Sequence, residues 1–389
     1  MMRMTLAELK KLLMNPLLLV LLPLLLGLDL YRIYDRQQEM IGQYPQHYAA
    51  QQAEYDKVSG AWDNGKIQYV LSEYRRTKAI IDAGGYSTEP GQPGTKSGFI
   101  FGDYGIFGQI KTEMEAVWHY GDTINDVLTR AEENAAFYAQ KGNRYSAALN
   151  EKIAKTYQNR RADGFYDTSG VRAYLAHDLS TLLILLLLIL LLSPLFAREH
   201  ELDMHGLLQL TPNAEKLPVC KLAAGGLAVC GISLLFFAAD FLAFSYLYRI
   251  RGLSQPLWTV AGYEYTPLNI GIGAYLMLNA AFKLLCFLVI GSLCAMFSAA
   301  SKKELIPFCG TFVTALVLFL ADAFSDSLLL HRLSPVSLCT AGNLFRRFEV
   351  LRIGNTPVPA YWLPVAAAGT ALILICVLTV QTAKRGRAK

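Results

Sequence analysis

Long apolar runs recur along this chain, and polar stretches of very unequal length separate them. A helix needs about 20 apolar residues to cross the hydrocarbon core of a bilayer, and six of the runs reach that length. The pattern therefore predicts an all-α membrane protein with six transmembrane helices. The predicted spans are 12–30, 179–196, 221–248, 270–299, 305–323 and 361–380.

The longest polar interval, residues 31–178, lies between the first two predicted spans. Apolar residues recur at spacings of three and four through much of it, a pattern typical of amphipathic helices. The interval is also long enough to fold by itself. We therefore expect a mainly helical domain here, inserted between the first two transmembrane helices.

Lysine and arginine close to the membrane ends indicate the orientation, because cytoplasmic loops carry an excess of both. With six spans drawn, most of these residues fall on one side, which we expect to be cytoplasmic together with both termini. The segments on that side are the amphipathic lead 1–11, the loop 197–220, the turn at Lys302 and Lys303, and the tail 381–389. Residues 31–178 and the outer, re-entrant segment 324–360 are then extracytoplasmic.

The outer segment 324–360 departs from this charge rule, since it contains Arg346 and Arg347. Apolar residues recur at helical spacing around these arginines, as in a helix that lies in the membrane interface. The apolar positions are Leu344, Phe345, Phe348 and Leu351. We expect a short interfacial helix at this place.

Composition agrees with a membrane protein, because 53% of the residues are hydrophobic and 17% are charged, against about 25% charged in a soluble domain. The seven cysteines all lie beyond residue 219 and form no CxxC pair, and the histidines lack the spacing of a metal site. We predict no catalytic, cofactor-binding or metal-binding residue. The charges of residues 31–178 nearly balance, which argues against a nucleic-acid surface.

The polar segment after the second span carries a distinctive local pattern. Its three carboxylates are Glu199, Glu201 and Asp203. Negative charge is favourable at the positive end of a short helix. Gly206 would allow another backbone to approach closely, and Thr211–Pro212 would end the helix, because a residue before proline avoids the helical region. We expect a short, stiff cytoplasmic helix over residues 199–212.

The stretch "FAREHELDMHGLLQLTPNAEKLPVCK", from Phe196 to Lys221, resembles the coupling-helix region of ABC-2-type transporter permeases, the membrane subunits of type-2 ABC exporters. The shared features are an aromatic residue, an acidic cluster, a glycine, a Leu-Leu-x-Leu-Thr-Pro run and a lysine. Leu207 stands where threonine is common in the family. The lead "LAELKKLLMNPLLLVLLPLL", the link "QPLWTVAGYEYTPLNIGIGAYL" and the region "FEVLRIGNTPVPAYWLPV" are similar to other parts of the family pattern.

This resemblance implies a six-helix half-transporter that works with a second permease subunit, identical or paralogous. It also implies that a separate ABC ATPase subunit rests on the coupling helix, and that ATP and Mg²⁺ bind to that partner. The chain itself would hold no cofactor, and its "GQPGTKSG" stretch has Thr95 where a phosphate-binding loop requires glycine. The coupling residues implied are Glu199, Glu201, Asp203, Gly206, Leu207, Leu210, Thr211 and Pro212.

Polar residues inside the predicted spans are expensive in lipid and usually face a protein interior or water. Asp240 in the third span and Lys283 in the fourth are of this kind. They would either pair structurally or line a substrate path. We expect Asp29, Asp322 and Asp326, near the outer ends of their spans, to be solvated.

The expected function is outward export of a peptide, lipid-like compound, drug or ion across a bacterial plasma membrane, in contact with membrane lipids and with no nucleic-acid partner. Two alternatives stay open. One is a membrane receptor with an extracellular helical domain. The other is a mechanical ABC-type envelope factor that carries no substrate.

Overall fold

The computed structural model describes residues 1–42, 45–83, 96–202, 204, 214–324 and 332–385. Within these ranges the chain is mainly helical, and its two sheets have two strands each. Six helices are long and apolar enough to cross a bilayer, as in a multi-pass membrane protein. They are Pro16–Ile41, Ser169–Glu201, Ala214–Leu247, Ile272–Ala300, Leu305–Phe324 and Trp362–Lys384. The helical class and the six spans are thus confirmed.

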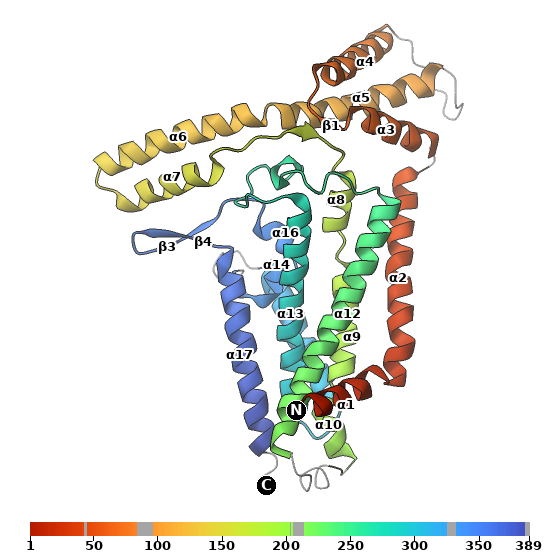
Figure 1. The fold of residues 1–389 in the computed structure, drawn as a ribbon, viewed down its shortest axis with the longest axis vertical. Helices are drawn as coiled ribbons and strands as arrows, with labels where there is room; N and C mark the ends of the chain where they lie inside the picture. Colours follow the sequence, from red (N-terminus) through yellow and green to blue (C-terminus); the bar gives the residue numbers. More distant parts are fainter. Residues whose placement is uncertain (43–44, 84–95, 203, 205–213, 325–331, 386–389) are drawn as a thin grey trace.

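The chain begins with the amphipathic helix α1 (Met2–Leu13), which lies across the foot of the bundle (Figure 1). The next helix, α2 (Pro16–Ile41), starts where the Asn15 side chain accepts a 3.1 Å hydrogen bond from the Leu17 amide. It ends at Gly42, whose φ of +59° is readily adopted only without a side chain. The helix therefore continues well past the predicted boundary at residue 30.

A helical domain (residues 45–165), which we call the cap domain, lies between the first two long apolar helices. Its helices are α3 (Pro45–Val58), α4 (Asn64–Asp82), α5 (Lys96–Trp118), α6 (Tyr120–Gln140) and α7 (Arg144–Tyr157). Strand β1 (Gly60–Ala61) pairs antiparallel with β2 (Gly164–Phe165) and joins the two ends of the domain. The cap covers one end of the bundle, the cap end, whereas both termini lie at the other, the base end (Figure 1).

The second span is built from three helices in succession, α8 (Ser169–Leu175), α9 (Leu179–Leu192) and α10 (Pro194–Glu201). Helix α9 is apolar on all sides, which is typical of a helix at the centre of a bundle. Accordingly 72% of the residues in the most apolar 18-residue stretch of this span are buried, against 17% in the corresponding stretches of the fifth and sixth spans. The long helices α12 (Leu217–Leu247), α13 (Ile272–Ala300), α14 (Leu305–Phe324) and α17 (Trp362–Arg385) complete the bundle.

Before the last span the chain forms a hairpin rather than the expected interfacial helix. Among the described residues from 334 to 360, the helical elements are the short 3-10 helix η3 (Pro335–Leu338) and the single-turn α-helix α16 (Ala341–Leu344). Strands β3 (Val350–Ile353) and β4 (Thr356–Pro359) then pair antiparallel across a two-residue turn, in which Gly354 has a φ of +61°. The prediction of a helix through Leu351 is therefore wrong.

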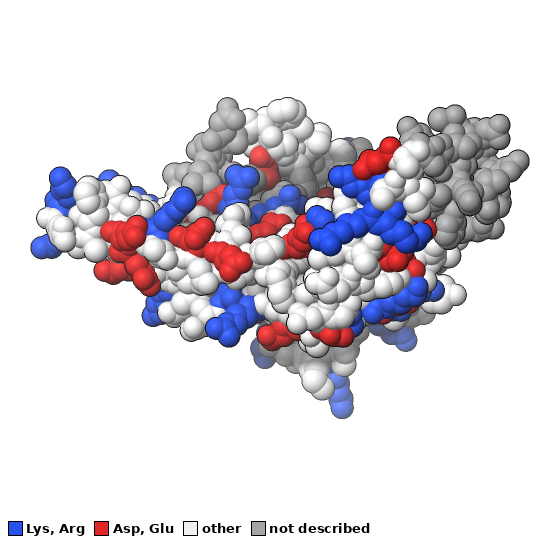
Figure 2. All heavy atoms as spheres, turned by 90° about the horizontal axis from the view of Figure 1, so that it is seen from above, with Lys and Arg blue, Asp and Glu red and all other residues white. Residues whose placement is uncertain are grey.

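Arg160 fixes the cap domain to the loop between α12 and α13. Although only 4% exposed, its guanidinium donates to the Thr266 carbonyl at 2.7 Å and to the Asn269 side chain at 2.9 Å. It also lies 4.5 Å from the ring centre of Tyr157 and 4.7 Å from that of Trp258. Seen from the cap end, acidic and basic side chains are interspersed over the described surface (Figure 2).

Candidate functional site

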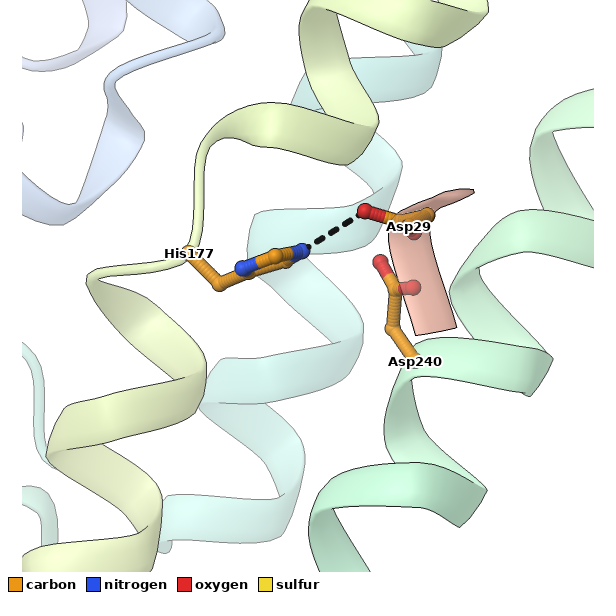
Figure 3. A group of neighbouring side chains, drawn as sticks. All are labelled: Asp29, His177 and Asp240. Carbon is orange, nitrogen blue, oxygen red and sulfur yellow. Dashed lines mark hydrogen bonds and ion pairs between the residues drawn. The ribbon is translucent and has the colours of Figure 1, made fainter. Parts of the chain in front are cut away.

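Three ionisable side chains meet inside the cap-end half of the bundle (Figure 3). Asp29 comes from α2, Asp240 from α12, and His177 from the turn between α8 and α9. Their exposed fractions are 0%, 4% and 6%. One donor atom of each residue lies within 4.8 Å of the donor atoms of the other two. We call this group the cap-end cluster.

Helical spacing explains why both carboxylates face inward. Asp29 is four residues from Leu25 and four from Ile33, so it occupies the face of α2 that packs against the bundle. Asp240 stands in the same relation to Phe236 and Phe244 on α12. The turn between α8 and α9 brings the third side chain to the same depth.

Hydrogen bonding satisfies the cap-end cluster only in part. His177 Nε2 lies 2.8 Å from Asp29 Oδ1, and the imidazole ring packs edge-on against Phe244. Asp29 Oδ2 and Asp240 Oδ1 have no hydrogen-bond partner among the described residues. An uncompensated buried carboxylate is destabilising by on the order of several kcal/mol. The cluster therefore requires an added proton or cation to balance its charge.

The three aspartates expected to be solvated differ in their exposure. Asp29 is fully buried, so the expectation that it is solvated is wrong. Asp322 is partly buried, and Asp326 lies outside the described residues. The ammonium of Lys283 lies 3.2 Å from Thr181 Oγ1 and 3.8 Å from an Asp178 carboxylate oxygen.

Asp240 faces the protein interior as expected, and it lies beside Asp29 rather than in an ion pair with Lys283 within the described structure. The sequence interpretation overlooked Asp29 and His177. For Asp29 the sequence did contain a signal, because Asp29 lies on the same helical face as Leu25 and Ile33. For His177 no local sequence pattern indicates a contact with Asp29, which lies 148 positions earlier in the chain.

A second group of buried charges, the base-end cluster, lies near the termini. Lys221 is 0% exposed and forms an ion pair with Glu199. Its ammonium also donates to the Leu195 carbonyl at 2.8 Å and lies 5.0 Å from the Phe196 ring centre. Lys11 of α1 lies 3.6 Å from the same carboxylate. The Glu8 carboxylate lies 4.0 Å from the Lys11 ammonium, so the two cations of this cluster are matched by two carboxylates.

Ser298 of α13 holds the backbone where α9 gives way to α10. Its hydroxyl oxygen accepts hydrogen bonds from the amides of Phe196 and Ala197 at 2.9 and 3.0 Å. The same hydroxyl donates to the Ser193 carbonyl at 2.7 Å. The break before Pro194 is thus bound to the neighbouring span, and the start of α10 has a fixed direction.

The far end of α10 contacts the start of α14. A carboxylate oxygen of Glu201 accepts from the Glu304 amide at 3.1 Å, and Arg198 lies 3.7 Å from the Glu304 carboxylate. Of the coupling residues expected from the sequence, Glu199 and Glu201 lie in the last turn of α10 and not at the start of a helix, so that expectation is wrong for them, and both are engaged inside the chain. The remaining ones lie outside the described residues: Asp203, Gly206, Leu207, Leu210, Thr211 and Pro212.

The fold defines a helical multi-pass membrane protein with a large cap domain between its first two spans. Comparison with known protein families, with curated proteins and with solved structures gives no match for this chain. The structural features that bear on its function are the two clusters of buried charge and the contacts of α10.

Proposed function

We infer that this chain is the permease subunit of an ATP-driven exporter of the ABC-2 type, moved by a separate ATPase subunit. The observation that carries this inference is the attachment of α10 to α1, α12, α13 and the residue before α14, because α10 contains Glu199 and Glu201, the first residues of the segment that resembles a coupling helix. The chain would do no bond chemistry, because ATP and Mg²⁺ would bind to the partner.

The contacts of α10 suit it to transmit force. Glu199 joins it to Lys11 of α1 and Lys221 of α12, Ser298 joins it to α13, and Glu201 joins it to the start of α14. A partner that displaces the chain just after α10 would therefore move these helices together. Rigid-body movement of this kind is a common way of coupling distant sites.

Further contacts would carry such a movement toward the cap end. Gln37 near the end of α2 donates a 2.7 Å hydrogen bond to the Leu247 carbonyl at the end of α12. Tyr248 donates to the Ile33 carbonyl at 3.3 Å. Because α2 runs unbroken from the base end to the cap domain, the two helices would tilt as a pair.

The proposed setting is a bacterial plasma membrane, with the base end in the cytoplasm and the cap domain outside. The exposed apolar faces of α14 and α17 fit contact with lipid and with a second permease subunit. The cargo would be a peptide, lipid-like compound, drug or ion.

The unbroken α2 also favours a second candidate, a mechanical ABC-type factor that moves its cap domain and carries no cargo. Reconstituted vesicles separate the two candidates. ATP hydrolysis accompanied by transport supports the exporter. Hydrolysis with a change in cap-domain position, followed by cysteine cross-linking, and with no transport supports the mechanical factor.

Both candidate functions require a separate ATPase subunit. Affinity purification of the tagged chain from its native membranes tests this requirement. We expect an ATPase subunit to co-purify. Glu201→Lys should reduce the bound ATPase at least tenfold, since it reverses a charge at the start of the coupling segment. Glu132→Lys, on the exposed surface of the cap domain, makes the same change far away and should retain it. Absence of any ATPase after cross-linking in native membranes would overturn the proposal.

Cysteine labelling in whole cells tests the orientation. In a cysteine-free variant, a single cysteine at Glu132 should react with a membrane-impermeant maleimide in intact cells. A cysteine at Lys384, at the base end, should react only after permeabilisation. The reverse pattern would place the α10 contacts on the wrong side for a cytoplasmic ATPase.

A further inference from the structure

The cap-end cluster combines two carboxylates and one imidazole from three separate segments (Figure 3). Its donor atoms lie within 4.8 Å of one another. A tetrahedral ion with metal–ligand bonds of about 2.0–2.2 Å holds its ligands roughly 3.4 Å apart, so side-chain shifts of about 1 Å would bring all three into contact with one ion. We propose that Asp29, His177 and Asp240 form an intramembrane site for a divalent transition-metal ion.

The unpartnered oxygens supply a second, independent reason. Asp29 Oδ2 and Asp240 Oδ1 lack hydrogen-bond partners among the described residues, and both side chains are more than nine-tenths buried. Buried polar atoms are almost always satisfied, by protein, water or an ion. A metal ion at the centre of the cluster satisfies oxygens from both carboxylates at once.

Charge balance points to an ion with two positive charges. Two carboxylates and a neutral imidazole carry a net charge of −2, which a divalent cation cancels inside a low-dielectric bundle. The ammonium of Lys283 is held by Thr181 and Asp178, and within the described structure it makes no ion pair with the cluster.

The ligand types select the kind of ion. Calcium, magnesium and alkali ions prefer sites made of oxygen ligands alone. An imidazole with two carboxylates suits Zn²⁺ or Mn²⁺. Three protein ligands also leave a coordination position for water or for a group on a passing molecule. The ion would join α2, α12 and the start of α9, so binding would depend on the relative position of these helices.

Metal binding to the purified full-length chain tests this site. The protein carries a tag without histidine, is stripped with a chelator in detergent, and is dialysed against Zn²⁺ or Mn²⁺. Bound metal is then counted by mass spectrometry. We expect one ion per wild-type chain. Asp29→Asn and Asp240→Asn should each weaken binding at least tenfold, whereas Asp178→Asn, which removes a neighbouring exposed carboxylate, should bind as the wild type does.

The thermal midpoint gives a second readout that does not depend on the ATPase partner. Added metal should raise the midpoint of the wild type and of Asp178→Asn, and leave that of Asp240→Asn unchanged. If an asparagine variant fails to fold, His177→Gln replaces it. Less than about one-tenth of an ion per wild-type chain, or wild-type binding by the Asp29→Asn, Asp240→Asn double variant, would overturn the proposal and indicate that the carboxylates share a proton instead.

Discussion

The two ends of the bundle bury charge in different ways. At the base end, the Lys221 ammonium has a carboxylate, a carbonyl and an aromatic ring around it. At the cap end, Asp29 and Asp240 retain two oxygens without partners among the described residues. The balanced cluster needs nothing more to hold its helices together. The unbalanced one depends on a proton or an ion, and such dependence is typical of buried charge with a function.

Removal of Lys221 should give the largest effect. Lys221→Met leaves the Glu199 carboxylate, 12% exposed, with only Lys11 nearby. Loss of one partner from a buried pair typically destabilises a protein by about 3–5 kcal/mol. Unfolding in detergent should report a loss of this size. The double variant Lys221→Met, Glu199→Gln should recover most of it, and an equal loss in the double variant would contradict the ion-pair interpretation.

Arg160 is a buried cation outside both clusters. Its hydrogen-bond acceptors are neutral, so its removal measures the cost of losing a buried cation that leaves no charged partner behind. Arg160→Met removes hydrogen bonds to Thr266 and Asn269 and should destabilise the docked cap domain by about 2–3 kcal/mol. Hydrogen exchange should rise in residues 257–271. Arg160→Lys keeps the charge without the planar fork of donors, so it should restore only part of the protection. Unchanged exchange in both variants would show that other contacts dock the cap.

Replacing Ser298 tests how much neutral hydrogen bonds contribute to the free energy of unfolding at the base end, compared with the ion pair of Lys221. Ser298→Ala leaves two amides of α10 without their acceptor and should lower the free energy of unfolding by about 1–2 kcal/mol. Ser292→Ala on the same helix is the control, because that hydroxyl bonds only the Val289 carbonyl of its own helix in the described structure. Equal effects would mean that the α10 contact adds no stability.

Asp240 should give the smallest effect and the sharpest contrast with Lys221. In metal-free protein, Asp240→Asn removes a buried carboxylate whose Oδ1 has no hydrogen-bond partner among the described residues. The free energy of unfolding should therefore rise, or stay within about 1 kcal/mol of the wild type. Thermal and denaturant unfolding after chelation measure this. A loss of about 3 kcal/mol or more would place the cap-end cluster in the same class as the Lys221–Glu199 pair.

The membrane part of the fold could be predicted because a bilayer imposes a length on every apolar helix. The end of α2 could not. Hydropathy falls after Leu30, yet the helix remains hydrogen-bonded as far as Gly42. Hydropathy marks where a helix leaves an apolar environment, whereas a stop signal such as glycine marks where the helix itself ends.

The cap-end cluster was beyond prediction because its contacts join distant parts of the chain. In the sequence, Asp29 lies near the end of an apolar run, as a residue at a membrane boundary does. In the folded chain, the turn between α8 and α9 places His177 against it. The hairpin of β3 and β4 is different, since its signal was present in the sequence. Gly354–Asn355 between two short runs is a recognised two-residue turn. The apolar spacing of residues 344–351 concealed it, because short runs fit helix and strand alike.

The short pairing of β1 with β2 closes the neck of the cap domain. A methyl group at Gly164 would lie 2.3 Å from the Gly60 carbonyl oxygen, so only glycine permits the two strands to lie this close. Helix α5 secures the same neck from one side, because Ile106, Ile110 and Met114 pack with Phe165 and the Glu113 carboxylate accepts a 3.0 Å hydrogen bond from Arg172 of α8. The separation of the first two spans at the cap end is therefore set by backbone pairing, apolar packing and an ion pair together, and a movement of α5 would reach the second span directly.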